Sequence, residues 1–417
     1  MDGEIMSTQK IAIIGSGISG LSCAYTLASQ HDITVYEAAG YIGGHTHTVQ
    51  VDKGGEITDV DTGFIVFNDR TYPHFIGLME KLGVEYQPTE MSFSVRNDAA
   101  DLEYNGNNLN SLFAQRRNVI RPAFIRMVAD IVRFNKEVLA AAAKGEMQTI
   151  GEFLATNRYS TLFRENYLLP MVSAIWSMGL ESCMDFPLDF FVRFFDNHGL
   201  LNITNRPQWY TIVGGSSSYI KPLTASFQDR IRLNSPVLRV ERNENKVSVV
   251  TDRGSEEFDQ VVFACHGPQA LSLLSQPTQD EQNVLQEFTT SENTVILHTD
   301  ISFLPKRRLA WASWNYNMVD AAQEQSTLTY HMNILQRLDT RHNYLVTLNQ
   351  HVPEQHILGT YTYSHPVYTQ GAIQAQQQWD RISGKNRTHF CGAYWFNGFH
   401  EDGVRSGLRV AAALEDS

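Results

Sequence analysis

The amino-acid sequence predicts an α/β protein with a parallel sheet at its N-terminus and a mixed α+β domain inserted into the domain that bears this sheet. Three observations favour this class. A short buried strand is followed at once by a glycine-rich turn and a helix, strands joined by polar turns return near the middle of the chain, and the chain closes on a strand, a turn and a helix. Its 417 residues exceed what one small core requires, so two domains are the default.

The first element is a β-α-β unit. Residues 11–14 form a continuous apolar run, typical of a buried parallel strand, and residues 21–28 carry apolar side chains at helical spacing. Between them lies a G-x-G-x-x-G motif, Gly15-Ser16-Gly17-Ile18-Ser19-Gly20. The first glycine permits a tight turn, the second lets the backbone approach a pyrophosphate, and the third allows close helix–strand packing. The helix N-terminus then favours the anion.

The next strand, residues 33–36, ends at Glu37. A carboxylate at this place accepts hydrogen bonds from an adenosine ribose and disfavours a 2′-phosphate. Because the strand, the glycine motif, the helix and the terminal acid agree, the sequence predicts a Rossmann-type unit that binds FAD or NAD.

The remaining elements follow from periodicity and turn residues. A β-rich stretch ends at residues 59–64, and the chain is mainly helical from about 72 to 200. The expected helices cover residues 72–82, 121–145, 150–154 and 167–178, and the expected strands cover residues 237–240, 247–250 and 260–264. Residues 271–380 mix both types before the final strand, turn and helix.

The composition is that of an acidic globular protein with a net charge of −12. We therefore expect no nucleic-acid partner, because neutralising phosphates requires a basic surface. The four cysteines lie far apart without a Cys-x-x-Cys pair, so we expect reduced thiols, no metal site and a cytoplasmic location. We expect no secretory signal, because the residues before the first strand contain no apolar segment of the kind a signal peptide has. We expect no membrane span, because the chain has no apolar run of some 18 residues. Contact with a membrane surface stays open.

Three features resemble the FAD proteins of the amine-oxidase and phytoene-desaturase superfamily. The pair Gly43-Gly44 follows the ribose-binding acid closely, residues 231–271 look like the central FAD segment, and Gly392 with residues 398–403 is similar to the closing motif. The resemblance implies a second backbone contact with the diphosphate, an adenine contact at the strand residue matching Val237, and a final helix whose N-terminus faces the flavin. It implies FAD rather than NAD, on an amine-oxidase-like fold of the two-dinucleotide-binding type.

The motif and the resemblance together name the residues expected to contact FAD: Gly15, Ser16, Gly17, Ile18, Ser19, Gly20, Glu37, Ala38, Gly43, Gly44, His45, Gly63, Phe64, Val237, Gly392, His400, Glu401, Asp402 and Val404. The chain departs from the superfamily at two places. His45 stands where arginine is usual, so charge support for the phosphates is weaker and pH-dependent, and Tyr394 stands where many relatives carry an acid for the ribityl chain. No cysteine lies in a covalent-flavin context, so we expect FAD to be held non-covalently.

Four stretches, residues 61–68, 309–316, 365–368 and 390–407, resemble a bacterial family of predicted NAD/FAD-binding, amine-oxidase-like proteins. Its members are typically encoded near cyclopropane-fatty-acyl-phospholipid synthases, and they look like the flavin domain fused to the plant cyclopropane synthases. The resemblance implies oxidation or desaturation of methylated or unsaturated acyl chains, by hydride transfer to flavin, with a lipid methyltransferase as a partner. The alternatives are a soluble amine or amino-acid oxidase, and a non-catalytic flavin-binding partner of a lipid methyltransferase.

We expect the FAD domain to be discontinuous. It comprises residues 9–70, 206–270 and 383–417, and residues 71–205 and 271–382 form the substrate domain. The substrate, a lipid or another small molecule, would enter between the two domains.

His400 is the candidate catalytic residue, because it lies in the motif that should face the flavin. It could accept or relay a proton, with a pKa tuned by the helix N-terminus, or it could be hydrogen-bonded to the flavin or to backbone. His365 and His266 are weaker candidates. An oxidative flavoenzyme does not strictly require a protein acid or base.

Three further segments each have two interpretations. The five phenylalanines of residues 186–201 line an apolar channel or fill a core. Residues 115–136, with five arginines, one lysine and one acid, form a basic amphipathic helix on anionic lipid headgroups or pack on the second domain. Two aromatic clusters, Trp311, Trp314 and Tyr316 with Tyr394, Trp395 and Phe396, sandwich an amine or pack beside the flavin.

Overall fold

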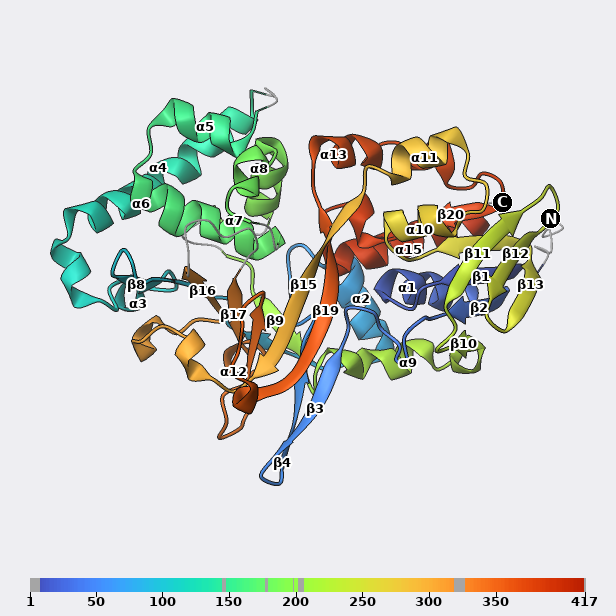
Figure 1. Cartoon of the computed structure of the whole chain (residues 1–417), viewed down its shortest axis with the longest axis horizontal. Helices are drawn as coiled ribbons and strands as arrows, with labels where there is room; N and C mark the ends of the chain where they lie inside the picture. Colours follow the sequence, from blue (N-terminus) through green and yellow to red (C-terminus); the bar gives the residue numbers. More distant parts are fainter. Residues whose placement is uncertain are drawn as a thin grey trace.

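The computed structural model describes residues 8–144, 148–176, 179–197, 199–201, 206–318 and 327–415. Its N-terminal region is built on a five-stranded sheet in the order β10-β2-β1-β14-β20, in which every neighbouring pair is parallel (Figure 1). The strands are β1 (Lys10–Ile14), β2 (Asp32–Tyr36), β10 (Ile231–Arg232), β14 (Gln260–Phe263) and β20 (Thr388–Phe390). Segments far apart in sequence thus complete one sheet, as the predicted fold class requires.

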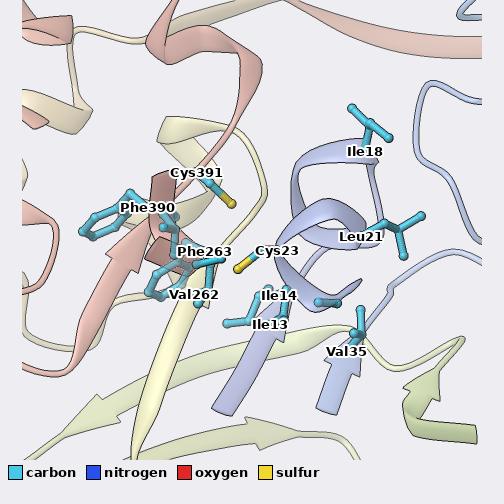
Figure 2. Close-up of a cluster of buried hydrophobic side chains, with 14 of the residues drawn as sticks. Ile13, Ile14, Ile18, Leu21, Cys23, Val35, Val262, Phe263, Phe390 and Cys391 are labelled. Carbon is cyan, nitrogen blue, oxygen red and sulfur yellow. The ribbon is translucent and has the colours of Figure 1, made fainter. Parts of the chain in front are cut away.

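Two helices pack against each other beside this sheet. They are α1 (Ile18–Leu27), which follows the first glycine motif, and α15 (His400–Glu415), which ends the described chain. Figure 2 shows Cys23 of α1 among the side chains of β1, β14 and β20, where Ile14, Val262 and Phe263 are buried. Small residues allow the close approach, because a Cβ on Gly407 would overlap the carbonyl oxygen of Ser19.

A second, seven-stranded sheet has the order β19-β15-β18-β17-β16-β7-β8. Its strands are β7 (Phe93–Asn97), β8 (Leu102–Asn105), β15 (Thr289–His298), β16 (Trp314–Met318), β17 (Leu328–His331), β18 (Leu345–Leu348) and β19 (Ile357–Val367). The long pair β15 and β19 runs between the two halves of the molecule in Figure 1.

Three smaller sheets complete the strands. They contain β11 (Val237–Arg242), β12 (Val247–Thr251) and β13 (Gly254–Phe258); β3 (Thr48–Lys53) and β4 (Glu56–Asp61); and β5 (Val66–Asn68), β9 (Trp209–Ile212) and β6 (Tyr86–Thr89). The strands expected over residues 237–240, 247–250 and 260–264 are all present.

The expectation of a mainly helical region from 72 to 200 is wrong for residues 86–105, which form β6, β7 and β8. The reason is that their partners are distant. β7 pairs in parallel with β16, more than 200 residues further along, and β6 pairs with β9. Periodicity within a short window does not register such non-local pairing.

The helices of this region are otherwise where the sequence places them. α2 (Pro73–Leu82), α4 (Pro122–Ala142), α5 (Ile150–Asn157) and α7 (Leu169–Trp176) correspond to the expected helices, although residues 145, 177 and 178 lie outside the described part. The remaining α-helices are α3 (Leu109–Leu112), α6 (Thr161–Phe163), α8 (Leu188–Asn197), α9 (Ile220–Thr224), α10 (Gly267–Leu273), α11 (Gln279–Leu285), α12 (Met332–Leu335), α13 (Gln370–Gln376) and α14 (Trp379–Ile382).

The phenylalanines of the α8 region are core residues. Phe186, Phe190, Phe191, Phe194 and Phe195 are all buried in one hydrophobic cluster. Trp176 of α7 packs against four of these rings, with centroid distances from 4.4 to 6.3 Å. Among the described residues, no helix combines the length and the apolar character that a membrane span requires.

Candidate functional site

The glycine motif forms a turn at the carboxyl end of β1, with space beside its second glycine. Gly15 donates its N–H to Tyr36 O (2.8 Å) and has a φ of +113°, and a Cβ there would lie 2.7 Å from Ala264 O. At Gly17, by contrast, a Cβ would meet no heavy atom within 4 Å. The Gly17 backbone therefore borders open space at the N-terminus of α1, where an anion is favoured.

Glu37 ties this turn to the end of β2. Its carboxylate accepts hydrogen bonds from Ser16 N (3.0 Å), Ser16 Oγ (2.6 Å) and Ala39 N (2.8 Å). The backbone of the same segment accepts N–H groups from Asn234 and Ser235, which precede β11. Glu37, Ala38 and Val237 therefore belong to segments that meet at one end of the site, as the resemblance implies for the adenosine half of the cofactor.

The second glycine pair packs directly on the first motif. Gly43 has a φ of +130° and donates its N–H to Ser16 Oγ (3.3 Å), and a Cβ on Gly44 would lie 3.1 Å from the Gly17 Cα. His45 O accepts the N–H of Phe64 (2.7 Å), and a Cβ on Gly63 would overlap the same oxygen. The turns at residues 15–20, 43–45 and 63–64 therefore form one continuous backbone surface.

The N-terminus of α15 lies beside that of α1. A Cβ on Gly403 would lie 2.6 Å from Ile18 Cγ2 and 3.1 Å from Ser19 Oγ, and Val404 is buried in the same core. Two helix N-termini thus converge near the open space at Gly17, which concentrates unpaired N–H groups and positive dipole ends there.

The two acids at the start of α15 have local structural tasks. The Glu401 carboxylate accepts the N–H groups of His74 (3.0 Å) and Phe75 (2.8 Å), which fixes the start of α2. The Asp402 carboxylate accepts the N–H of Phe399 (2.9 Å), and burial raises its pKa to about 7. Because both side chains are engaged with backbone, the contacts that a cofactor would make at these two residues are those of their backbone N–H groups.

Three histidines from distant segments gather around the second glycine turn. The ring of His45 lies 5.5 Å from His365 of β19 and 6.2 Å from His266 at the start of α10. Burial lowers the pKa of His45, that of His266 to about 4 and that of His365 to about 3. Burial therefore disfavours the cationic form of all three rings. No metal-binding group of three ligand side chains is present in the part of the chain that the structure describes.

His400 is buried in a hydrogen-bonded, aromatic environment. Its ring stacks on Phe64 with centroids 3.7 Å apart, and its Nε2 lies 2.8 Å from Tyr219 Oη and 3.3 Å from Thr46 Oγ1. Burial lowers its pKa well below the ordinary value. This geometry favours the interpretation of a hydrogen-bonded histidine that joins α15 to the loop at residues 43–46.

Sequence analysis missed Thr46 and Tyr219, which hold His400. The sequence does contain a local signal, the pair Gly214-Gly215, and the structure gives both glycines positive φ values in a turn before Ser216. The Asp61 carboxylate accepts the Ser216 N–H and Oγ–H and thereby anchors this turn near Tyr219. Burial raises the pKa of Asp61 to about 7.

The turn at Gly392, which precedes α15, is followed by a buried tyrosine hydroxyl. Gly392 donates its N–H to Ser406 Oγ (3.0 Å), and Tyr394 follows in a buried position, where its hydroxyl has no hydrogen-bond partner within the described part of the chain. Tyr394 packs on Phe288, whereas Trp314 packs on Tyr330. In the described residues no ring contact joins the 311–316 cluster to the 394–396 cluster.

The residues present fit a bound dinucleotide. The backbone at Gly17 borders a space that a Cβ would fill, two helix N-termini point there, and His45 Nε2, in the second glycine turn, is buried with no hydrogen-bond partner among the described residues. Unpaired buried polar atoms are costly, so a polar ligand that satisfies them would be stabilised.

Comparison with known proteins agrees with this geometry. Residues 18–346 match the family described as flavin-containing amine oxidoreductases. An L-amino-acid oxidase of Gloydius blomhoffii is 24% identical over 263 residues, covering 60% of this chain and 50% of that protein. The chain spans about half the length of the curated relatives that it matches.

Solved structures show the same fold over nearly the whole chain. Cyclohexylamine oxidase from Brevibacterium oxydans has a TM-score of 0.69 at 17% identity, covering 98% of this chain and 99% of that one. A fatty acid isomerase from P. acnes that produces CLA has a TM-score of 0.68 at 15% identity, covering 97% and 98%. The predicted fold class and the predicted FAD cofactor are confirmed, and the association with cyclopropane synthases stays a prediction.

Proposed function

This chain belongs to the flavin-containing amine oxidoreductase family, and we propose that it is an FAD-dependent oxidoreductase that oxidises or desaturates acyl chains of lipids. The observation that carries this proposal is the aromatic contact between α8 and the start of α15. Phe194 stacks on Phe399, with centroids 4.8 Å apart, immediately before His400. The phenylalanine core of the helical region thus reaches the turn beside the cofactor site.

A second contact of the same kind supports an apolar substrate. Phe190 stacks on Tyr368 with centroids 4.9 Å apart, and a Cβ on Gly398 would lie 2.5 Å from the Tyr368 hydroxyl. Phe399 is half-buried and packs against both the cluster around the parallel sheet and the phenylalanine cluster. An uncharged chain that contacts the half-buried Phe399 ring loses nothing by leaving water, whereas a charged group would need a partner.

The electrostatics of the site favour the same substrate class. The histidines nearest the second glycine turn are neutral at pH 7, because burial lowers the pKa of His45, His266 and His365. FAD, when bound, accepts hydride from a C–H bond, so the protein has to bind the chain, orient it and exclude water. The half-buried Phe399 would contact the chain, with the buried Phe194 ring stacked against it, and the two helix N-termini would stabilise negative charge.

The second candidate function is oxidation of an amine or amino acid. The family description and the curated L-amino-acid oxidase favour it. A different aromatic pair from the one expected also suits it, because the rings of Tyr361 and Tyr363 stack in parallel, 6.3 Å apart, beside His47. A non-catalytic flavin-binding partner of a lipid methyltransferase is the third possibility, and it predicts that no substrate reduces the flavin.

Anaerobic reduction of bound FAD distinguishes these functions. We expect phospholipids with unsaturated or methyl-branched acyl chains to bleach the visible flavin band, and amines and amino acids to leave it unchanged. Phe194→Leu, which keeps an apolar side chain, should retain most of the rate, and Phe194→Gln should lose it while still binding FAD. Reduction by amines but not by lipids would contradict the proposed substrate, and reduction by neither would support the non-catalytic alternative.

A further inference from the structure

Exposed apolar side chains are concentrated on one short stretch of the chain. Among the described residues, thirteen large hydrophobic side chains are exposed, and six of them lie between residues 109 and 139. The largest exposed fractions are those of Ile120 (84%) and Leu109 (76%). Single exposed apolar residues are ordinary, but a cluster of this kind marks a contact surface.

Helix α4 presents such residues along its outward side. Ile125, Val132 and Leu139 are spaced seven residues apart, so they lie on one face of the helix, and all three are exposed. The same row contains Ala129 and Lys136 and no acid. The opposite side, with Phe124 and other buried residues, packs in the hydrophobic core, so α4 is apolar on both faces.

The acidic side chains of α4 make contacts within the protein, whereas arginines of this region are exposed. Of the two acids of α4, Asp130 is buried and accepts the N–H of Ser160 (3.0 Å), whereas Glu137 is partly exposed and accepts the hydroxyl of Tyr159. Arg116 and Arg126 are exposed, in a chain whose net charge is −12. A basic, partly apolar face on an acidic protein is complementary to an anionic surface that also has an apolar interior.

We propose that the exposed side chains of residues 109–139, the docking face, seat this protein on a bilayer that contains anionic phospholipids. Helices α3 and α4 form one outer end of the molecule, far from the parallel sheet (Figure 1). Ile120, Val119 and Ile125 enter the boundary between headgroups and acyl chains, and the arginines contact the phosphates. This inference does not depend on the proposed reaction, since an amine oxidase could dock in the same way.

A bilayer explains the docking face better than a second copy of this chain. A second copy carries the same basic side chains, so an isologous contact would bring Arg116, Arg126 and Lys136 of each copy toward those of the other. The apolar row is also spread along a helix of 21 residues, as in helices that lie flat in a membrane interface.

Vesicle sedimentation of the full chain with FAD tests the proposal. We expect binding to vesicles of phosphatidylcholine with phosphatidylglycerol, weaker binding as salt is raised, and little binding to phosphatidylcholine alone. Ile120→Glu should weaken binding about tenfold or more. The double variant Arg116→Gln, Arg126→Gln should weaken it roughly fivefold for each charge removed.

Matched controls lie outside the docking face. Ile57→Glu, at a side chain 62% exposed on the β3–β4 hairpin, and Arg253→Gln, in the turn before β13, should bind as the wild type does. Equal FAD content shows that each variant is folded. Absence of binding to anionic vesicles would overturn the proposal, as would binding that both docking-face variants leave unchanged. If the protein bound no vesicles and formed a dimer that Ile120→Glu dissociates, the docking face would be an interface between two copies.

Discussion

The close packing of α1 against α15 predicts that a methyl group added at Gly407 destabilises the protein. In Gly407→Ala, the new Cβ would overlap Ser19 O and lie 3.1 Å from Cys23 N, inside the ~3.5 Å optimum for non-bonded atoms. Both obstacles are backbone atoms, so no side-chain rotation relieves them. The helices must part by about 1 Å. We expect the free energy of unfolding to fall by about 1–3 kcal/mol.

Gly77→Ala is the matched control, because Gly77 lies in α2, is exposed, and has no atom within 4 Å of the added Cβ. It should gain roughly 0.5–1 kcal/mol from reduced chain entropy. Urea titration of both variants, followed by circular dichroism, should therefore separate them by about 1.5–4 kcal/mol. FAD should also bind less tightly to Gly407→Ala, but not to Gly77→Ala, because only the first substitution separates the N-termini of α1 and α15. Equal urea midpoints for the two variants would show that α1 and α15 do not pack as closely as described.

Three further predictions concern charged and titratable groups. Glu37→Ala removes the acceptor for Ser16 and should weaken FAD binding by about 10- to 100-fold in fluorescence titrations, whereas Glu37→Gln should lose less. Burial raises the pKa of Asp402 to about 7 in the folded protein, above its value in the unfolded chain. The side chain therefore lowers the free energy of unfolding as the pH rises from the unfolded pKa through 7. Asp402→Asn should raise the free energy of unfolding by about 2–3 kcal/mol more at pH 8 than at pH 5. The pKa values of His266 and His365, about 4 and about 3, lie below those in the unfolded chain, so the stability that the two neutral rings contribute is lost as the pH falls below about 6.5. In His365→Gln, the urea midpoint should therefore decrease less steeply between neutral and acidic pH than in the wild type.

Local patterns explain what the sequence could predict. The turn at Gly15 to Gly20, the strand ending at Glu37 and the helix after Gly398 are each specified within a few residues, and all of them occur in the structure. Secondary structure of this kind depends on chain geometry and on hydrogen bonds to near neighbours, so a single sequence is sufficient to predict it.

Other features depend on contacts between distant segments. The strands at residues 86–105 exist because β7 pairs with β16 and β6 with β9. Residues from three separate elements form the cluster of His45, His266 and His365, and no spacing in the sequence links them. Glu401 looks like a flavin-facing acid in sequence, but its carboxylate holds the start of α2.

FAD titration of the wild type and of Gly17→Val measures whether the turn at Gly17 holds the cofactor. Gly17 has a φ of −68° and a ψ of 172°, which valine also adopts, so the substitution fills the open space without straining the backbone. We predict that the wild type binds one FAD per chain, that Gly17→Val binds none, and that Gly77→Val binds as the wild type does. A wild-type protein that stays colourless with added FAD, or a Gly17→Val variant that binds FAD normally, would contradict the account.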